Sequence, residues 1–79
     1  MMTTVSEFDK ILDMKQSLIE EKRALDVKSE TLERFFRTAA FASMERVSKA
    51  LMRQQLDAMR EYSGVLARRL ELMSRGYTP

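Results

Sequence analysis

The sequence contains no cysteine, no histidine and no tryptophan, and has only two glycines and one proline among 79 residues. Without cysteine there is no disulfide framework, thiolate metal site or thiol nucleophile. Without histidine the commonest general base and metal ligand is missing too. Because no glycine-rich phosphate loop and no nucleophile–base pair is found either, we expect a protein that is not an enzyme and has no catalytic site, metal or cofactor.

Long apolar runs are also missing from the sequence. The longest run is a few residues, far short of the ~20 needed to span a bilayer, and the N-terminus has no signal-peptide pattern. We therefore expect a cytoplasmic protein. Acids interrupt the basic face of the second half, which argues against attachment of a helix to a membrane surface.

The sequence is rich in charge, at 33%, and in hydrophobic residues, at 44%. Residues 1–39 hold seven basic and eight acidic residues, and residues 40–79 hold seven and four, so the halves carry −1 and +3. A chain this short gains only a few kcal/mol from a single core. Since disulfides and cysteine metal sites are excluded, we expect oligomerisation or a partner protein to supply the remaining stability.

Both glycines and the proline lie at or beyond residue 64, and the rest consists mainly of good helix formers. Thr4 and Glu7 have the spacing of a capping box, and Gly76 suits a helix C-terminus. We predict an all-α fold with a single domain over residues 1–79. Its two long amphipathic helices, about 6–37 and 43–75, form an antiparallel hairpin with coiled-coil-like packing that assembles into a helical bundle.

The position of the turn is weakly marked, because neither candidate segment contains glycine, proline or asparagine. Val27–Thr31 is one candidate and Thr38–Ser43 is the other. We favour the second because the leucine heptad continues through Leu32, although one continuous helix remains an alternative. Gly64 interrupts a good helical pattern, but the heptad stays in register across it, so we expect the second helix to continue there.

The first helix has one apolar line at heptad spacing, which we predict to be the hairpin seam. Its residues are Phe8, Ile11, Leu18, Leu25 and Leu32. Four residues after Ile11, Leu18 and Leu25, at the positions called a in a heptad, the sequence has Lys15, Lys22 and Ser29. The two lysines either extend to water at the edge of the seam or meet acids on a partner helix.

The second helix has an apolar arc that covers about half of its circumference, more than one neighbouring helix can cover. A first line at heptad spacing, joined by Leu56 and Leu70, closes the hairpin, and a second line about 100° away remains for a partner. Together they predict a partner or oligomer interface at Met44, Val47, Leu51, Met52, Met59, Tyr62, Val65, Leu66 and Met73.

Four basic residues, Arg46, Lys49, Arg53 and Arg60, lie opposite this arc. They form a possible contact face for phosphates or acidic groups. Acids are interspersed among the basic residues of this half, and no aromatic residues interleave with them, which favours an ordinary solvated face. Nucleic acid is therefore a weaker alternative than protein as the partner.

The segment Gln54–Met73, with Tyr62-Ser63, resembles the C-terminal helix of needle-type secretion subunits. In size and all-helical heptad character the chain also looks like small hairpin chaperones and helical plasmid or phage regulators. The Pro/Asn-rich turn of the needle subunits is missing here, so no functional residue is carried over from them.

These patterns predict a non-enzymatic protein–protein interaction module, either a small adaptor or chaperone or a subunit of a helical assembly. The partner is a protein, bound through helix packing as a homo-oligomer or a hetero-complex. One alternative is a dimeric helical nucleic-acid-binding regulator that uses the basic face. The other is a small structural subunit of the secretion type.

Overall fold

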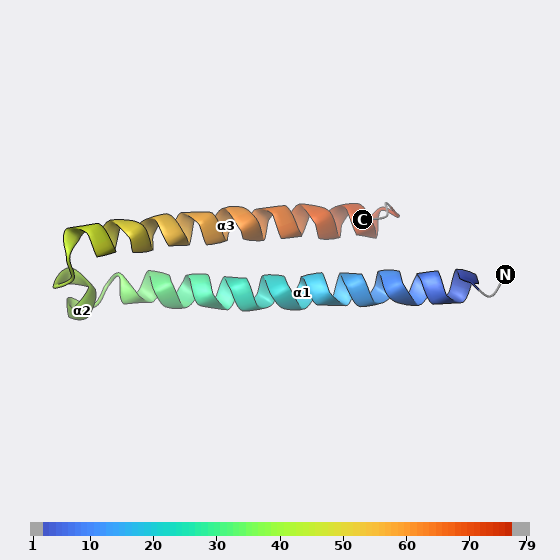
Figure 1. Ribbon diagram of the computed structural model, residues 1–79, viewed down its shortest axis with the longest axis horizontal. Helices are drawn as coiled ribbons and strands as arrows, with labels where there is room; N and C mark the ends of the chain where they lie inside the picture. Colours follow the sequence, from blue (N-terminus) through green and yellow to red (C-terminus); the bar gives the residue numbers. More distant parts are fainter. Residues whose placement is uncertain (1–2, 77–79) are drawn as a thin grey trace.

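A computed structural model describes residues 3–76 as three helices: α1 (Thr3–Phe35), α2 (Ala39–Ala42) and α3 (Arg46–Ser74). The long helices α1 and α3 pack side by side in opposite directions, and the short α2 lies in the turn between them (Figure 1). The described part of the chain contains no strand. The predicted all-α helical hairpin is therefore confirmed.

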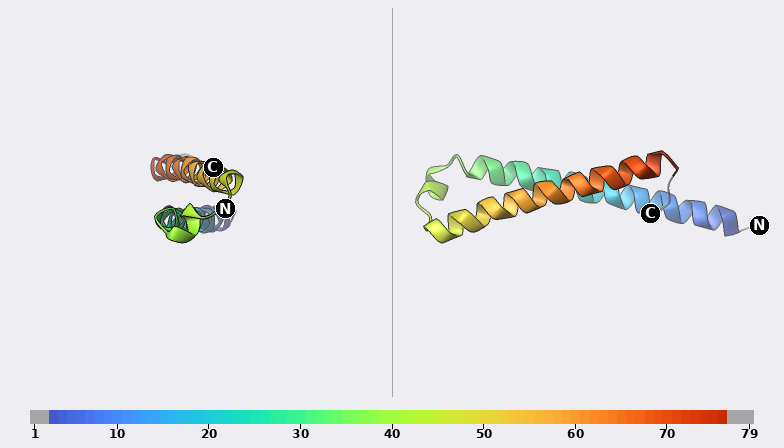
Figure 2. Two further views of the ribbon diagram at one scale, coloured as in Figure 1. Left: turned by 90° about the vertical axis from the view of Figure 1, so that its left-hand side faces the viewer. Right: turned by 90° about the horizontal axis from the view of Figure 1, so that it is seen from above.

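The molecule is a narrow rod whose principal extents are 62 × 16 × 15 Å. Its radius of gyration is 17.8 Å, whereas a compact domain of this length would have about 12 Å. Figure 2 shows that the two long helices cross one another, and within residues 3–76 no further long helix lies beside them. A rod of two helices has room for only a small core.

Four apolar side chains are buried in the described part of the chain: Leu18, Phe41, Leu56 and Leu66. Of these, Leu66 retains 0% of its accessible surface. Leu56 and Leu66 of α3 lie on the side that packs against α1. This small core supports the view that the hairpin alone has limited stability.

The predicted seam of α1 is covered along part of its length. Leu18 is buried, and Leu25 and Leu32 are half-buried. Ile11 is 36% exposed, because α1 extends beyond the C-terminal end of α3 (Figure 1). The side chain of Phe8, also predicted in the seam, lies outside the described residues.

The turn occupies the second of the two predicted positions, and aromatic side chains and Thr38 build it. The Phe41 ring is 4.7 Å from that of Phe36 and 5.9 Å from that of Phe35, centroid to centroid. Thr38 Oγ1 accepts a hydrogen bond from the Phe41 backbone N–H at 3.2 Å and donates to the Phe35 carbonyl at 2.7 Å. These contacts stabilise the turn, which contains no glycine or proline.

The observed helix ends differ by a few residues from the predicted ranges 6–37 and 43–75. Because α1 already begins at Thr3, the predicted capping box of Thr4 and Glu7 does not mark its start, and the Thr4 side chain lies outside the described residues. Helix α3 continues through Gly64, as predicted. Gly76 has a φ of 90°, the left-handed conformation expected after a helix C-terminus.

Candidate protein-binding face

Helix α3 has a line of large apolar side chains that α1 does not cover. They are Val47 at 68% exposure, Leu51 at 59%, Tyr62 at 43%, Val65 at 48% and Leu72 at 47%. We call this set the open stripe. At about 100° per residue, it is centred roughly 120° around α3 from the side that buries Leu56 and Leu66.

The open stripe has heptad spacing. Leu51, Val65 and Leu72 fall on one line with Ala58, each seven residues or a multiple of seven apart. Ala58 is exposed as well. This period keeps one side of a helix facing a neighbouring helix along its length, so the stripe has the form of a coiled-coil seam without its second helix.

A groove of ≈ 400 Å³ runs between α1 and α3 beside the open stripe. Its lining residues are Lys28, Thr31, Leu32, Phe35, Met52, Gln55 and Met59. Gln55 follows Leu51 by one helical turn, which places the groove next to the stripe. Met52 and Met59, two residues of the predicted interface, are half-buried here and keep part of their surface accessible.

Three other residues of the predicted interface have different positions. Leu66 is fully buried between α1 and α3, so it belongs to the hairpin seam and has no surface to offer a partner. Met44 lies in the turn before α3 begins, because the turn is longer than the sequence pattern indicated. Met73 is half-buried near the C-terminal end of α3.

Tyr62 joins the open stripe to α1. Its hydroxyl donates a hydrogen bond to a carboxylate oxygen of Glu21. This bond to a negative group raises the pKa of the Tyr62 phenol above its ordinary value. The bond orients the ring while leaving 43% of the residue exposed.

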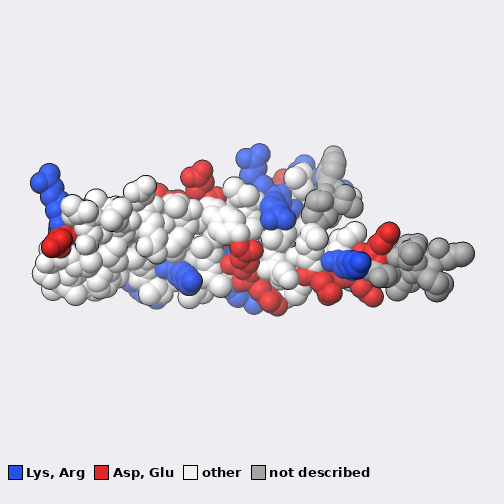
Figure 3. All heavy atoms as spheres, viewed as in Figure 1, with Lys and Arg blue, Asp and Glu red and all other residues white. Residues whose placement is uncertain are grey.

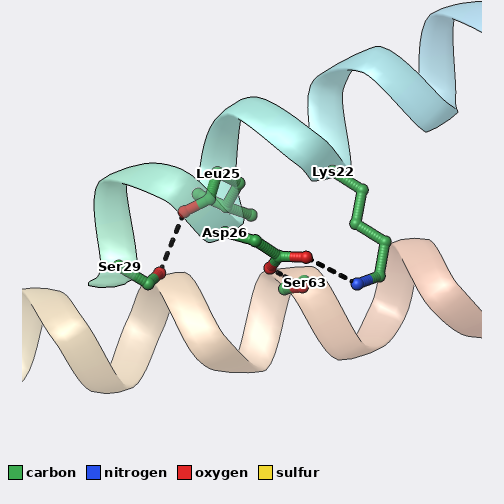
Figure 4. A network of polar contacts seen from close by, with 5 residues as sticks. All are labelled: Lys22, Leu25, Asp26, Ser29 and Ser63. Carbon is green, nitrogen blue, oxygen red and sulfur yellow. Dashed lines mark hydrogen bonds and ion pairs between the residues drawn. The ribbon is translucent and has the colours of Figure 1, made fainter. Parts of the chain in front are cut away.

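A polar network crosses the hairpin near its middle (Figure 4). Asp26 accepts a hydrogen bond from Lys22 Nζ at 2.7 Å and another from Ser63 Oγ at 2.5 Å. The bond from Lys22, followed by that from Ser63, lowers the pKa of Asp26 below its ordinary value. Nearby, Ser29 Oγ donates to the Leu25 carbonyl at 3.0 Å. Both serines are buried, so small polar side chains occupy the point where the helices meet.

The same network includes Lys22, one of the two lysines predicted at the a positions of the seam. Lys22 is half-buried, and its ammonium pairs with an acid of its own helix. Neither predicted alternative described this pairing. The combination of Asp26 with Ser63 across the hairpin was not found from the sequence, because no local pattern connects residues so far apart in the chain.

Most of the predicted basic face is engaged within the hairpin. Arg60 forms an ion pair with Glu33 of α1 at 2.6 Å, and this bond lowers the pKa of the Glu33 carboxyl. The Arg53 guanidinium lies 5.2 Å and the Lys49 ammonium 5.7 Å from the centre of the Phe41 ring. Three of the four residues of the predicted basic face therefore contact other parts of the hairpin.

Residues 3–76 contain no group of three or more acidic side chains placed to hold a metal ion. In the same range, neither long helix is apolar enough over a sufficient length to cross a bilayer.

The fold and its surface define a small helical-hairpin protein in which α1 covers only part of the apolar surface of α3. A sequence model of the Sequestin family matches residues 12–72, which include both sides of the hairpin and the whole open stripe. The chain belongs to this family. Membership supports a small protein with a protein-binding type of function. No curated protein matches the chain, and neither does any solved structure.

Proposed function

We propose that this protein is a non-enzymatic binding protein that attaches to another protein chain through the open stripe of α3. The observation that carries the proposal is the exposure of the five stripe residues, 43–68% each, on one side of one helix. Single exposed apolar residues are ordinary on protein surfaces, but a continuous line of them marks an interaction site.

The spacing of the stripe supports a helix as the binding element of the partner. Leu51, Val65 and Leu72 recur in heptad register, and Met52 and Met59 line the adjacent groove. An amphipathic helix places side chains at this period into such a groove. Methionine side chains adapt to the shape of what they contact, which suits a binding groove.

The family match is in keeping with this role, since it supports a protein-binding type of function. An adaptor, a chaperone and a subunit of a helical assembly all use helix packing in this way. We do not extend the proposal to nucleic acid, since acids are interspersed among the basic residues of α3 and no aromatic residues interleave with them.

The test compares the full chain with a variant that carries Leu51→Asp and Val65→Asp. Both changes place a charge on the open stripe while leaving the buried side of α3 intact. The matched control is Ala67→Asp, since Ala67 is an exposed residue on the opposite side of the same helix. Circular dichroism establishes that all three proteins are equally helical before binding is compared.

Each protein is tagged, expressed in its host and recovered with whatever it binds, including untagged copies of itself. We expect the wild type and the Ala67→Asp control to recover the same protein. The stripe variant should recover at least tenfold less of it. Equal recovery by all three proteins would show that the stripe is not the binding surface.

A further inference from the structure

Within residues 3–76, no helix lies beside the N-terminal part of α1. Contacts across the hairpin align Arg60 with Glu33 and Ser63 with Asp26, so α3 ends before the start of α1 is reached (Figures 1 and 2). Leu18 is 5% exposed, whereas Ile11, seven residues earlier on the same line, is 36% exposed and Met14 is 43% exposed. We call residues 3–14 the ledge.

The ledge and the turn carry opposite charges. The ledge has three acids, Glu7, Asp9 and Asp13, and one lysine. Residues 34–53, which surround the turn, have five basic residues and one acid, Glu45; the basic ones are Arg34, Arg37, Arg46, Lys49 and Arg53. Figure 3 shows the acidic side chains gathered over the N-terminal half of α1. The rod is therefore acidic at one end of α1 and basic at the turn.

Two rods that meet along their open stripes can run parallel or antiparallel. The stripe spans Val47 to Leu72, about 38 Å at 1.5 Å per residue, so it runs along nearly all of α3. In the antiparallel arrangement the basic turn of each copy lies beside the acidic ledge of the other. In the parallel arrangement turn lies beside turn and ledge beside ledge, which places like charges together.

Shape favours the same arrangement. When α3 of one copy lies antiparallel to α3 of another, the turn that precedes Arg46 continues past Ser74 of the other copy. That is the space bordered by the ledge. The half-buried aromatic residues of the turn, Phe35 and Phe36, can then contribute apolar surface where Ile11 and Met14 lack a covering helix.

We propose that the occupant of the open stripe is a second copy of this chain, in an antiparallel two-fold dimer with the turn of each copy on the ledge of the other. The proposal rests on the function proposed above and names the partner. The two-fold symmetry makes the contact self-complementary, so each stripe and each turn–ledge contact occurs twice.

The first test is the mass of the purified full chain by light scattering and sedimentation over a range of concentrations. We expect twice the chain mass of 9.2 kDa. The variant with Leu51→Asp and Val65→Asp should shift to the mass of one chain, and the Ala67→Asp control should stay at twice that mass. A folded wild-type monomer at all concentrations would overturn the proposal.

The second test establishes orientation, using the absence of cysteine from the chain. Val47→Cys and Leu72→Cys are made as separate proteins. In the antiparallel dimer these positions are close to each other, whereas two copies of Val47 are ~38 Å apart. Mild oxidation should link the two proteins when they are mixed and leave either alone unlinked. Efficient linking of Val47→Cys to itself would show a parallel dimer and overturn the proposal.

The third test examines the turn–ledge contact. Arg37→Glu with Arg46→Glu should weaken dimerisation by roughly tenfold at low salt. Glu7→Arg should weaken it too, because Glu7 is one helical turn from Ile11 on the same side of α1 and is exposed. Each variant places like charges together, so combining these changes in one chain should restore most of the affinity. If the combined variant is as weak as the sum of the two losses, the turn does not lie on the ledge.

The outcomes for this dimer and for the proposed function can be told apart. Suppose that the wild type is monomeric and recovers another protein from the host, and that the stripe variant no longer recovers it. This result overturns the dimer and leaves the proposed function in place. A monomeric wild type whose stripe variant recovers the same host proteins as the wild type overturns both.

Discussion

Asp26 is the residue through which α1 and α3 are held in register. It accepts one hydrogen bond from Lys22 of its own helix and one from Ser63 of the other. Because Ser63 is 8% exposed, its hydroxyl needs a partner, and sliding the helices would leave it without one. A single polar pair in an apolar seam is an effective way to specify register.

Replacing Ser63 with alanine should lower the free energy of unfolding by about 1 kcal/mol, the net value of a typical hydrogen bond. The control is Ser74→Ala, since Ser74 is exposed and bonds only to the Leu70 carbonyl of its own helix. A second control is Ser17→Ala, since Ser17 is exposed in the interior of α1, where Ser→Ala changes helix propensity as it does at Ser63. The difference in urea denaturation between Ser63→Ala and Ser17→Ala isolates the contact with Asp26. Equal stability of the two variants would contradict a role in register.

The hairpin should lose stability at both ends of the pH scale. The folded-state pKa values of Asp26 and Glu33 lie below their ordinary values, so their contribution is complete above the unfolded pKa of about 4 and is lost as pH falls through the folded pKa. The folded-state pKa of Tyr62 is raised, so its contribution is complete below about 10 and is lost as pH rises through the folded pKa.

This pH dependence is measured by urea denaturation at a series of pH values, with Tyr62→Phe as the matched variant. Tyr62→Phe should remove the alkaline loss that arises from the phenol and leave the acid loss unchanged. An alkaline loss of the same size in Tyr62→Phe would show that another group is responsible.

At the scale of elements, α3 has two apolar sides and therefore two roles. One side packs against α1 through Leu56 and Leu66, and the other is the open stripe. Both sides depend on α3 being continuous. Gly64 is a weak point in the interior of this helix. There is room for a side chain at Gly64, since an added Cβ would meet no atom within 4 Å.

Gly64→Ala should therefore stabilise the protein by about 0.5–1 kcal/mol, because alanine loses less backbone freedom and nothing obstructs it. Gly76→Ala is the contrasting variant: Gly76 has a φ of +90°, where a side chain is strained, so this change should destabilise the C-terminal end of α3. Thermal unfolding followed by circular dichroism measures both. A loss of stability in Gly64→Ala would mean that the helix needs flexibility there.

At the scale of the whole molecule, two long helices enclose a core of few residues. Its buried apolar residues in the described chain are Leu18, Phe41, Leu56 and Leu66, and the radius of gyration, 17.8 Å, is that of a rod. A protein of this form is sensitive to any charge placed in the seam and tolerant of charges outside it. The proposed binding through the open stripe depends on that difference.

Leu18→Asp should unfold the hairpin, because it buries an unpaired carboxylate at a position that is 5% exposed. Leu51→Asp should leave the isolated chain helical, because that position is 59% exposed, and should affect only association. Circular dichroism at low protein concentration, where association is minimal, compares the two. Full helicity in Leu18→Asp would show that the seam is not where the fold is stabilised.

The sequence by itself determined the class of fold, because the period of its apolar residues and the absence of glycine and proline before residue 64 permit little except long helices. It also determined that α3 has more apolar surface than one neighbour can cover. Leu18, Leu25 and Leu32 could be assigned to the seam from their spacing alone, since a helix places residues seven apart on one side.

Only the tertiary structure decided which of these apolar residues are covered and which are open. It buried Leu66 and left Leu51 exposed, because the crossing of α1 and α3 covers one part of a wide apolar arc. It also joined Ser63 to Asp26 and Arg60 to Glu33, pairs that depend on the register of two helices. The register of α1 against α3 depends on the turn and on how the packed sides of the two helices fit together. The local spacing of residues along the chain predicts neither.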